Sequence, residues 1–300
     1  MSRLSKISRL TLGTAQLGMS YGVVNTARDI GMDDADAVLD AAWNAGITCF
    51  DTARVYGESE ARIGMWMARR NDASPVLVSK IPPLDGPDDT EAIEESFARS
   101  TAALGVDHID GLLCHRASDL SRPSVRASLE SLLADGRIER FGVSVYSSEQ
   151  LFSAIKIDTV GIVQLPLSLA NPKLLHEGAV AAAAERGILV FARSVYLQGI
   201  LLVPPQSLPG MFAPLAAPLR RLHALAREAR IEVSALALAA VKAAPGIHSI
   251  VVGAESPSQI TKTMAAFNRK PPRRALIDEA WLLFKDAPPE LVDPSRWPRR

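Results

Sequence analysis

Cysteine is scarce in this 300-residue sequence, which contains only Cys49 and Cys114, each inside an apolar run. There is no CxxC pair. This usage argues against a disulfide framework and is typical of buried thiols in a reducing compartment. The sequence also lacks an apolar run of about 18 residues, and the N-terminal MSRLSKISRL has no apolar stretch of signal-peptide length. We therefore expect a soluble, cytoplasmic protein that does not enter a membrane.

The sequence also has no net charge. Lys plus Arg and Asp plus Glu number 33 each, so no overall field predicts binding to nucleic acid or to an acidic membrane surface. The arginines of the C-terminal SRWPRR form a local basic segment, as expected of a solvated end. The expected partner is a small molecule, and the expected assembly is a monomer or a small homo-oligomer.

Several catalytic signatures are absent. The sequence has no GxSxG elbow and no cysteine–histidine pattern, which disfavours nucleophilic catalysis. It has neither HExxH nor clustered Cys and His, so no metal site is expected. The first apolar run is followed by LGTAQLG rather than GxGxxG, which disfavours a doubly wound dinucleotide-binding sheet.

Short apolar runs are what the sequence has in abundance. They lack polar alternation, which is typical of strands covered on both faces. They occupy residues 9–15, 46–52, 76–81, 109–115, 140–145, 160–167, 187–193 and 248–254.

Segments of helical period separate these runs. DDADAVLDAAWNAG starts with acidic capping residues, TEAIEESFARSTAALG starts at Thr90, and RPSVRASLESLLADG and LLHEGAVAAAAERG also close on a glycine. Eight strand–helix pairs without a compositional break predict one (β/α)8 TIM barrel over residues 1–300, with an outer ring of helices. The Pro-rich stretch 203–218 is predicted to be a long loop, and loops of that length are usually functional or mobile.

Four polar residues lie at the carboxyl ends of neighbouring predicted strands, where barrel enzymes place their chemistry. Asp51 ends the second strand, Tyr56 follows it, Lys80 is near the end of the third and His115 ends the fourth. A phenol is a poor acid or base at neutral pH, but a nearby ammonium lowers its pKa, and a carboxylate keeps that ammonium charged and in place. A histidine within reach can orient a carbonyl or share the proton. This set suits proton delivery to a carbonyl oxygen as hydride reaches its carbon.

The same residues carry a resemblance to the aldo-keto reductase family. Five segments resemble that family in order and spacing: GITCFDTARVYGESEARIG, VLVSKI, LGVDHIDGLLCHR, LLADGRIERFGVSVYS and IVVGAESPSQI. The resemblance covers residues 8–268, which leaves 269–300 as a C-terminal tail. The resemblance implies a catalytic tetrad of Asp51, Tyr56, Lys80 and His115, with Tyr56 as general acid/base. It also implies a nicotinamide dinucleotide that lies extended across the barrel mouth without a Rossmann fold.

Cofactor contacts follow from the resemblance, position by position. Gly13, Thr14 and Asp51 would lie near the nicotinamide ribose, and Ser144 and Gln164 would hold the carboxamide. Val145 stands where the family often has Asn. The remaining contacts implied are Arg193, Ser194, Leu197 and Gly199 after the seventh strand, and Gly253, Glu255, Ser256, Gln259 and Thr263 at the adenosine end.

Two departures from the family pattern bear on ligand choice. Arg193 stands where an aromatic ring usually stacks on the nicotinamide; its plane can stack too, but its charge could instead hold an anionic substrate. At the adenosine end, Gln259 replaces a frequent Arg, and Glu255 would repel a 2′-phosphate unless Lys262 compensates. NADP is the family default, and NAD is the alternative cofactor.

The substrate pocket is expected to include Tyr56 and His115 together with Tyr21, Arg116, Tyr146 and Tyr196, a set that favours a polar or sugar-like carbonyl. The function predicted is the interconversion of an aldehyde or ketone and its alcohol. The alternative is a non-catalytic, regulatory NAD(P)-binding subunit, like the channel-associated members of the family. A lyase or isomerase that uses Lys80 as a Schiff-base amine would leave Tyr56 unexplained.

Overall fold

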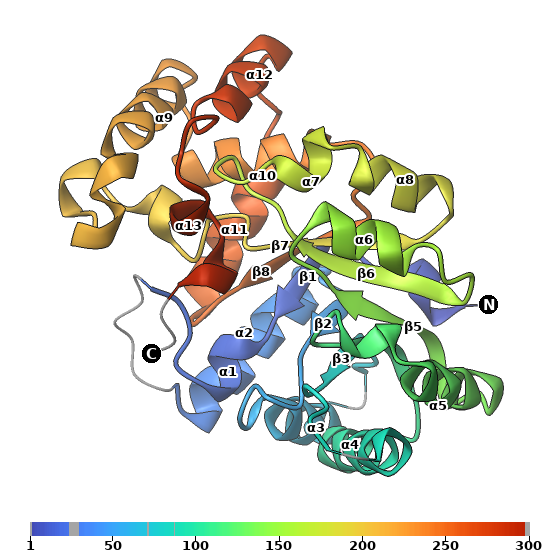
Figure 1. Ribbon diagram of the computed structural model, residues 1–300. Coiled ribbons are helices and arrows are strands. Elements are labelled where there is room, and N and C mark those ends of the chain that lie inside the picture. The colour runs from blue at the N-terminus through green and yellow to red at the C-terminus, as the bar shows by residue number, and fades with distance from the viewer. Residues whose placement is uncertain (1, 24–29, 71, 87, 298–300) are drawn as a thin grey trace.

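Eight parallel strands close into a barrel in the computed structural model, which describes residues 2–23, 30–70, 72–86 and 88–297 (Figure 1). Each strand pairs with the next along the chain, and β8 pairs with β1. The (β/α)8 barrel predicted from the sequence is therefore confirmed. The strands are β1 (Leu10–Gly13), β2 (Cys49–Asp51), β3 (Val76–Ile81), β4 (Ile109–Cys114), β5 (Ile138–Ser144), β6 (Val160–Pro166), β7 (Leu189–Arg193) and β8 (Ser249–Gly253).

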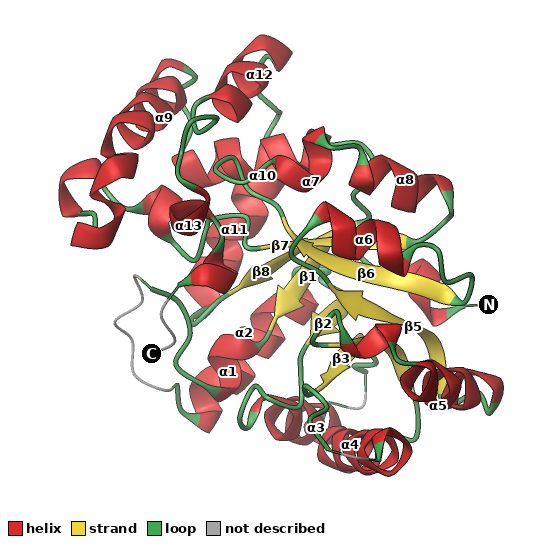
Figure 2. Ribbon diagram, in the orientation of Figure 1, coloured by secondary structure: helices red, strands yellow, loops and turns green. Residues whose placement is uncertain are grey.

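Helices surround these strands (Figure 2). They are α1 (Ala15–Gly18), α2 (Met32–Asn44), α3 (Ser59–Arg69), α4 (Asp89–Leu104), α5 (Pro123–Ala134), α6 (Ser148–Ala154), α7 (Lys173–His176), α8 (Ala179–Glu185), α9 (Ala216–Glu228), α10 (Val233–Ala243), α11 (Pro257–Asn268), α12 (Arg274–Leu282) and α13 (Pro289–Val292). Short 3₁₀ helices are η1 (Arg3–Lys6), η2 (Asp119–Ser121), η3 (Ile200–Leu202), η4 (Pro205–Ser207), η5 (Gly210–Leu215) and η6 (Pro294–Arg296). In the described part of the chain, no helix combines the length and the apolar character needed to cross a membrane.

The strands carry apolar side chains on both faces, which explains their near-continuous apolar runs. One cluster joins residues of six strands and so fills the inside of the barrel: Leu4, Cys49, Val76, Val78, Leu113, Ile162, Phe191 and Val251. The larger cluster lies between the sheet and the helices and includes Cys114. Both cysteines are free and buried, as the sequence predicted.

Two helix predictions are wrong in detail. The cap of α4 is Asp88 rather than Thr90, because the Asp88 carboxylate accepts from the backbone N–H groups of Thr90 and Glu91 at 2.9 and 3.1 Å. The segment LLHEGAVAAAAERG is not one helix. Gly178 adopts a left-handed φ of 75°, which ends α7 and starts α8.

Residues 203–218 do not form the irregular loop that their prolines suggested. The segment folds into η4, η5 and the first turn of α9, with Phe212 and Leu215 buried. The Phe212 ring packs edge-on against Trp297, with 4.9 Å between the ring centroids. The chain beyond residue 268 likewise forms α12, α13 and η6 and buries Trp281 and Leu291. The last two arginines of SRWPRR lie outside the described residues.

The loop after β2 is held against α1 by a glycine–glycine contact. A Cβ on Gly18 would lie 1.9 Å from the Tyr56 carbonyl oxygen and 2.4 Å from the Ser59 nitrogen. A Cβ on Gly57, whose φ is +57°, would lie 2.1 Å from the Gly18 oxygen. Only residues without a side chain allow this approach. The Tyr56 backbone is thus positioned directly by α1.

We expect Gly18→Ala to lower the free energy of unfolding by about 1–3 kcal/mol, because the added methyl group must push the 56–59 backbone away. Urea unfolding followed by circular dichroism measures this. Gly210→Ala is the matched control, since a Cβ there meets nothing within 4 Å. Equal stability of the two variants would contradict the close packing of α1 on this loop.

Candidate active site

The side chains at the barrel mouth continue the inward face of the strands. Because side chains alternate across a strand, a residue two positions beyond an interior one points the same way. Two residues beyond each interior apolar residue, towards the carboxyl end of its strand, lies a residue at the barrel mouth. The pairs are Cys49 and Asp51, Val78 and Lys80, Leu113 and His115, Ile162 and Gln164, Phe191 and Arg193, and Val251 and Gly253. The inward face therefore changes from apolar to polar at the mouth.

A buried ion pair forms the floor of this site. Lys80 Nζ lies 2.7 Å from Asp51 Oδ1, and the two side chains are 1% and 5% exposed. Lys80 Nζ also donates to the Thr52 carbonyl at 2.8 Å, and Gln164 Nε2 donates to the same Asp51 oxygen at 2.8 Å. Burial lowers the pKa of Lys80, while the Asp51 charge opposes that shift. The ammonium is therefore held by neighbours on two sides.

Tyr56 and His115 lie directly above this pair. Tyr56 sits on a tight turn in which its N–H donates to Ala53 O at 2.9 Å. Lys80 Nζ is 5.0 Å from the centroid of the Tyr56 ring. The rings of Tyr56 and His115 meet edge to face, with centroids 5.9 Å apart and planes at 89°. The structure thus brings together all four residues of the predicted tetrad.

The electrostatics of Tyr56 differ from the prediction. Its pKa is raised rather than lowered, first because the hydroxyl is buried and second because Asp51 is near. The cation that opposes this shift is the Arg193 guanidinium. The expectation that Lys80 lowers the pKa of Tyr56 below its ordinary value is therefore wrong: burial dominates, and the Lys80 ammonium is engaged by Asp51.

His115 is neutral at physiological pH. Burial lowers its pKa to about 3, and the Lys80 and Arg193 charges act in the same direction. Its Nδ1 is buried and has no hydrogen-bond partner among the described residues. A neutral imidazole carries one N–H donor, so His115 can hydrogen-bond to a ligand oxygen without contributing charge.

A cavity of about 310 Å³ opens beside Tyr56 and extends to the start of α11. Most of the predicted cofactor and substrate residues line it: Gly13, Thr14, Tyr21, Asp51, Tyr56, Arg193, Ser194, Tyr196, Gly199, Gly253, Glu255 and Gln259. The cavity also includes residues that the sequence analysis did not select, namely Ala15, Gln16, Gly22, Val195, Gln198, Val251 and Val252.

Other predicted residues lie behind the cavity wall. Leu197 is buried with a left-handed φ of 49°, and Thr263 hydrogen-bonds to Tyr196. Ser256 caps α11 by accepting from the Gln259 N–H. Ser144 is buried and reaches the guanidinium of Arg193, and Tyr146 packs under the same group.

Arg116 is not brought to the cavity. Its guanidinium donates to Asp85 Oδ1 at 2.6 Å, to Leu84 O at 2.6 Å and to Asp119 Oδ1 at 2.9 Å. The side chain therefore ties the loop after β4 to the loop after β3.

A network of buried hydroxyl groups, which the sequence pattern did not indicate, connects the ends of β1 and β2 to the start of α3. Ser59 Oγ donates to the Thr14 carbonyl at 3.0 Å, and Thr14 Oγ1 donates to the Asp51 carbonyl at 2.9 Å. Thr52 Oγ1 lies 3.0 Å from Ser59 Oγ. Ser59 begins α3 within SEARIG, and a lone serine at a helix start gives no signal beyond capping.

The site has features that fit a nicotinamide dinucleotide. Gln164 Oε1 is buried with no partner among the described residues, because its amide nitrogen is used on Asp51, and a carboxamide N–H₂ would supply the missing donor. Gly13 and Gly253 are paired across β1 and β8. A Cβ at Gly13 would lie 2.9 Å from Val251 Cγ1, and one at Gly253 would lie 2.3 Å from Gln16 Oε1. Glycine is needed at these positions because the Val251 and Gln16 side chains occupy the space that a Cβ would take.

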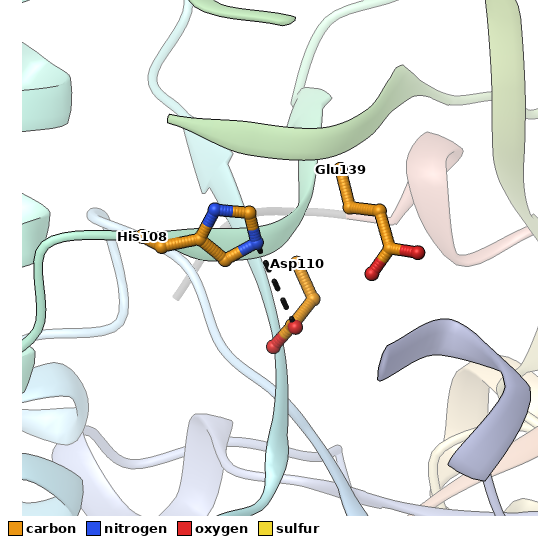
Figure 3. Close-up of side chains that lie close together, drawn as sticks. All are labelled: His108, Asp110 and Glu139. Carbon is orange, nitrogen blue, oxygen red and sulfur yellow. Dashed lines mark ion pairs between the residues drawn. The ribbon is translucent and has the colours of Figure 1, made fainter. Parts of the chain in front are cut away.

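A second cluster of titratable groups, His108, Asp110 and Glu139, lies at the start of β4 and β5, away from the mouth (Figure 3). Their ligand atoms lie within 4.8 Å of one another, an arrangement with metal-binding potential that the sequence did not predict. Arg3 uses both carboxylates, with Nε 2.6 Å from Asp110 Oδ1 and its backbone N–H donating to Glu139 Oε2 at 3.0 Å. We assign the cluster to attachment of η1 beneath the barrel.

Comparison with known proteins identifies the family. The model of the aldo/keto reductase family matches residues 9–277. The chain belongs to this family. Aldo-keto reductases are oxidoreductases that act on small carbonyl compounds and generally use nicotinamide cofactors. A solved structure of an aldo-keto reductase candidate from Pseudomonas aeruginosa has the same fold, with a TM-score of 0.66 at 22% identity over 87% of this chain and 90% of that chain.

The relatives of this chain have different roles. Aldo-keto reductase str7 of Strobilurus tenacellus is 31% identical over 67% of this chain and 60% of its own length. D-threo-aldose 1-dehydrogenase of a Pseudomonas species is 27% identical over 83% of this chain and 89% of its own length. A probable voltage-gated potassium channel subunit beta of Oryza sativa subsp. japonica is 27% identical over 87% of this chain and 90% of its own length. The family thus includes both catalytic and channel-associated proteins.

The depressed pKa of His115 predicts a pH-dependent contribution to stability. The unfolded chain takes up a proton near pH 6.5 and the folded protein only near pH 3, so this contribution is complete above pH 6.5 and is lost as the pH falls towards 3. We expect the unfolding free energy of wild type to fall relative to His115→Gln between pH 7 and pH 4, by on the order of 2 kcal/mol after allowance for partial exposure. Urea titrations at both pH values measure it, with the exposed His176→Gln as control. A difference that does not change with pH would contradict a buried neutral imidazole.

Proposed function

We propose that this protein interconverts an aldehyde or ketone and its alcohol by hydride transfer with a nicotinamide dinucleotide. The observation that carries the proposal is the position of Tyr56 in the cavity wall, above the buried Asp51–Lys80 pair and edge to face with His115. Carbonyl reduction needs a proton donor and groups that stabilise charge on the oxygen, and Tyr56, Lys80 and His115 supply a hydroxyl, a fixed cation and a neutral N–H at one place.

In the reductive direction Tyr56 acts as the general acid. Its raised pKa keeps the hydroxyl protonated at neutral pH, so a proton is available for the carbonyl oxygen of the substrate. The phenolate left behind is stabilised by the Arg193 charge, and it takes the proton back from an alcohol in the oxidative direction. His115 donates its single N–H to the same substrate oxygen. The dinucleotide, when bound, supplies or accepts the hydride.

The cofactor is proposed to run along the cavity from Tyr56 towards α11. Ser144 and Gln164 would hold the carboxamide, while Glu255 and Gln259 would lie near the adenosine ribose. Glu255 is half-buried, and burial raises its pKa. Lys262 is exposed and does not line the cavity. We infer that Glu255 weakens the family preference for NADP and makes NAD an effective cofactor.

A regulatory role without turnover is the second candidate, because a channel subunit is among the relatives. The tetrad geometry favours catalysis over this candidate. A spectrophotometric screen of NADH and NADPH against sugars, aromatic aldehydes and small keto acids separates the two. Turnover with any carbonyl supports the enzyme, and dinucleotide binding without turnover across the panel supports the regulatory subunit.

Tyr56→Phe should abolish most carbonyl reduction while the dinucleotide still binds, because only the transferable proton is removed. We expect kcat to fall by roughly 10²–10⁴-fold. Stopped-flow turnover and fluorescence titration of the dinucleotide measure the two properties. Tyr196→Phe, which removes a cavity hydroxyl bonded to Thr263, is the matched control and should lose far less. Near wild-type turnover in Tyr56→Phe would refute the assignment.

Glu255→Gln should shift cofactor preference towards NADP. Removal of a carboxylate from the ribose end relieves its repulsion of a 2′-phosphate, so the NADP/NAD ratio of kcat/KM should rise roughly tenfold. Steady-state kinetics with both dinucleotides test this, with the exposed Glu185→Gln on α8 as control. If the ratio does not move, Glu255 does not face the adenosine ribose.

A further inference from the structure

Arg193 is a cation at the catalytic end of the cavity whose known partners are all neutral. Its Nη2 and Nη1 donate to Ser144 Oγ and Ser194 Oγ at 3.4 and 3.5 Å, the long limit for hydrogen bonds. Its Cζ lies 4.4 Å from the centroid of the Tyr146 ring. Among the described residues no carboxylate forms an ion pair with it. Arg193 also hydrogen-bonds to the Tyr146 side chain. A guanidinium offers five N–H donors, so these three neutral hydrogen-bond partners do not neutralise its charge or use every donor.

Other arginines near the barrel mouth are satisfied differently. Arg54 lies 2.6 Å from Glu60 Oε2, and Arg116 lies 2.6 Å from Asp85 Oδ1 and 2.8 Å from Asp119 Oδ1. In the described part of the chain, Arg54 and Arg116 thus have acidic partners, whereas the arginine inside the cavity has none. A partly buried charge without a counter-charge is costly, so its retention points to an anion that arrives from outside.

The place for that anion is next to the reacting atoms. Burial raises the pKa of Tyr21 to about 12 and also raises that of Tyr56, and in both cases the Arg193 charge opposes the shift. Arg193, Tyr21 and Tyr56 line the same cavity. The charges around Tyr56 are one carboxylate, Asp51, and two cations, Lys80 and Arg193, because His115 is neutral. A ligand with one negative charge would balance this end of the cavity.

We propose that Arg193 binds a carboxylate or phosphate carried by the carbonyl substrate. This rests on the proposed oxidoreductase function and specifies its substrate class as anionic oxo compounds. The planar fork of Arg suits both anions, since each can accept two parallel N–H bonds. The dinucleotide phosphates are the competing source of negative charge. Glu255 and Gln259, where the adenosine end is proposed to lie, are at the other end of the cavity, whereas Arg193 lines it together with Tyr56 and Tyr21. This position favours the substrate over the dinucleotide as the source of the anion.

Matched substrate pairs test the proposal. One pair is 4-carboxybenzaldehyde and methyl 4-formylbenzoate, and the other is glyceraldehyde 3-phosphate and glyceraldehyde. The readout is the ratio of kcat/KM for the anionic member over the neutral one, because an effect of the variant on the dinucleotide cancels within a pair. We expect Arg193→Gln to lower this ratio roughly 10- to 100-fold for at least one pair. The pair that responds identifies the anion as carboxylate or phosphate.

Two further variants sharpen the test. Arg193→Lys keeps the charge without the fork and should restore part of the ratio. Arg116→Gln removes the other arginine that the sequence placed near the substrate, and it should leave both ratios unchanged because that side chain is held by Asp85 and Asp119. The proposal is overturned if Arg116→Gln lowers the anionic-to-neutral ratio of kcat/KM and Arg193→Gln does not. It is also overturned by unmoved ratios combined with a weaker dinucleotide Kd in Arg193→Gln, which would assign the residue to the cofactor.

A binding measurement keeps this inference separate from the proposed function. If wild type reduces none of the four aldehydes, calorimetric titration with benzoate and with inorganic phosphate replaces the kinetic readout, and benzamide is the neutral control. Binding of either anion that weakens about tenfold or more in Arg193→Gln supports the anion site even if the oxidoreductase proposal fails. Absence of anion binding to wild type, or equal binding by both proteins, refutes it.

Discussion

The structure of the site depends on one geometric constraint: in a closed parallel barrel, every second side chain points inward, and only the last inward layer reaches solvent. The interior is filled mainly with apolar residues such as Cys49, Val78, Ile162 and Phe191, and the buried Thr11 and Ser249 hydroxyls beside them hydrogen-bond to each other. The next inward position on each strand lies at the mouth. Polar and charged residues are tolerated there, and they necessarily converge because the strands surround a common axis.

Convergence brings charges into a region of low polarity, and the chemistry of the site follows from that. The buried Asp51–Lys80 pair gains two further hydrogen bonds, from Gln164 to Asp51 and from Lys80 to the Thr52 carbonyl, which offset part of the cost of its burial. The same burial keeps His115 neutral and Tyr56 protonated. Arg193 completes the inward layer with no acidic partner among the described residues, which leaves the Tyr56 end of the cavity with a net positive charge. Protonation states here are therefore set by the surroundings rather than by residue type.

Contacts at the start of the strands stabilise the barrel, and contacts at the mouth position the side chains of the candidate site. At the start of the strands, Arg3 ties η1 to Asp110 and Glu139 and Leu4 closes the interior. At the mouth, the Tyr56 loop is fixed by its backbone contact with Gly18 and by the Ser59–Thr14 hydroxyl contacts, so that a short turn holds the phenol in place. The first set of contacts closes the barrel, and the second set presents the side chains of the site.

The sequence by itself determined the strand–helix order, the closed barrel and the convergence of Asp51, Tyr56, Lys80 and His115, because apolar runs and strand ends are local signals that the barrel topology converts into positions. Tertiary structure alone decided the rest. The break at Gly178 and the folding of residues 203–218 depend on backbone geometry and packing that residue type does not specify. Arg116 looked like a substrate ligand in the sequence, but its guanidinium is held by Asp119, three residues further along, and by Asp85, which lies 31 residues away in the chain. The pKa of Tyr56 depended on burial and on Arg193, more than a hundred residues away, because electrostatic shifts are set by spatial distance and desolvation.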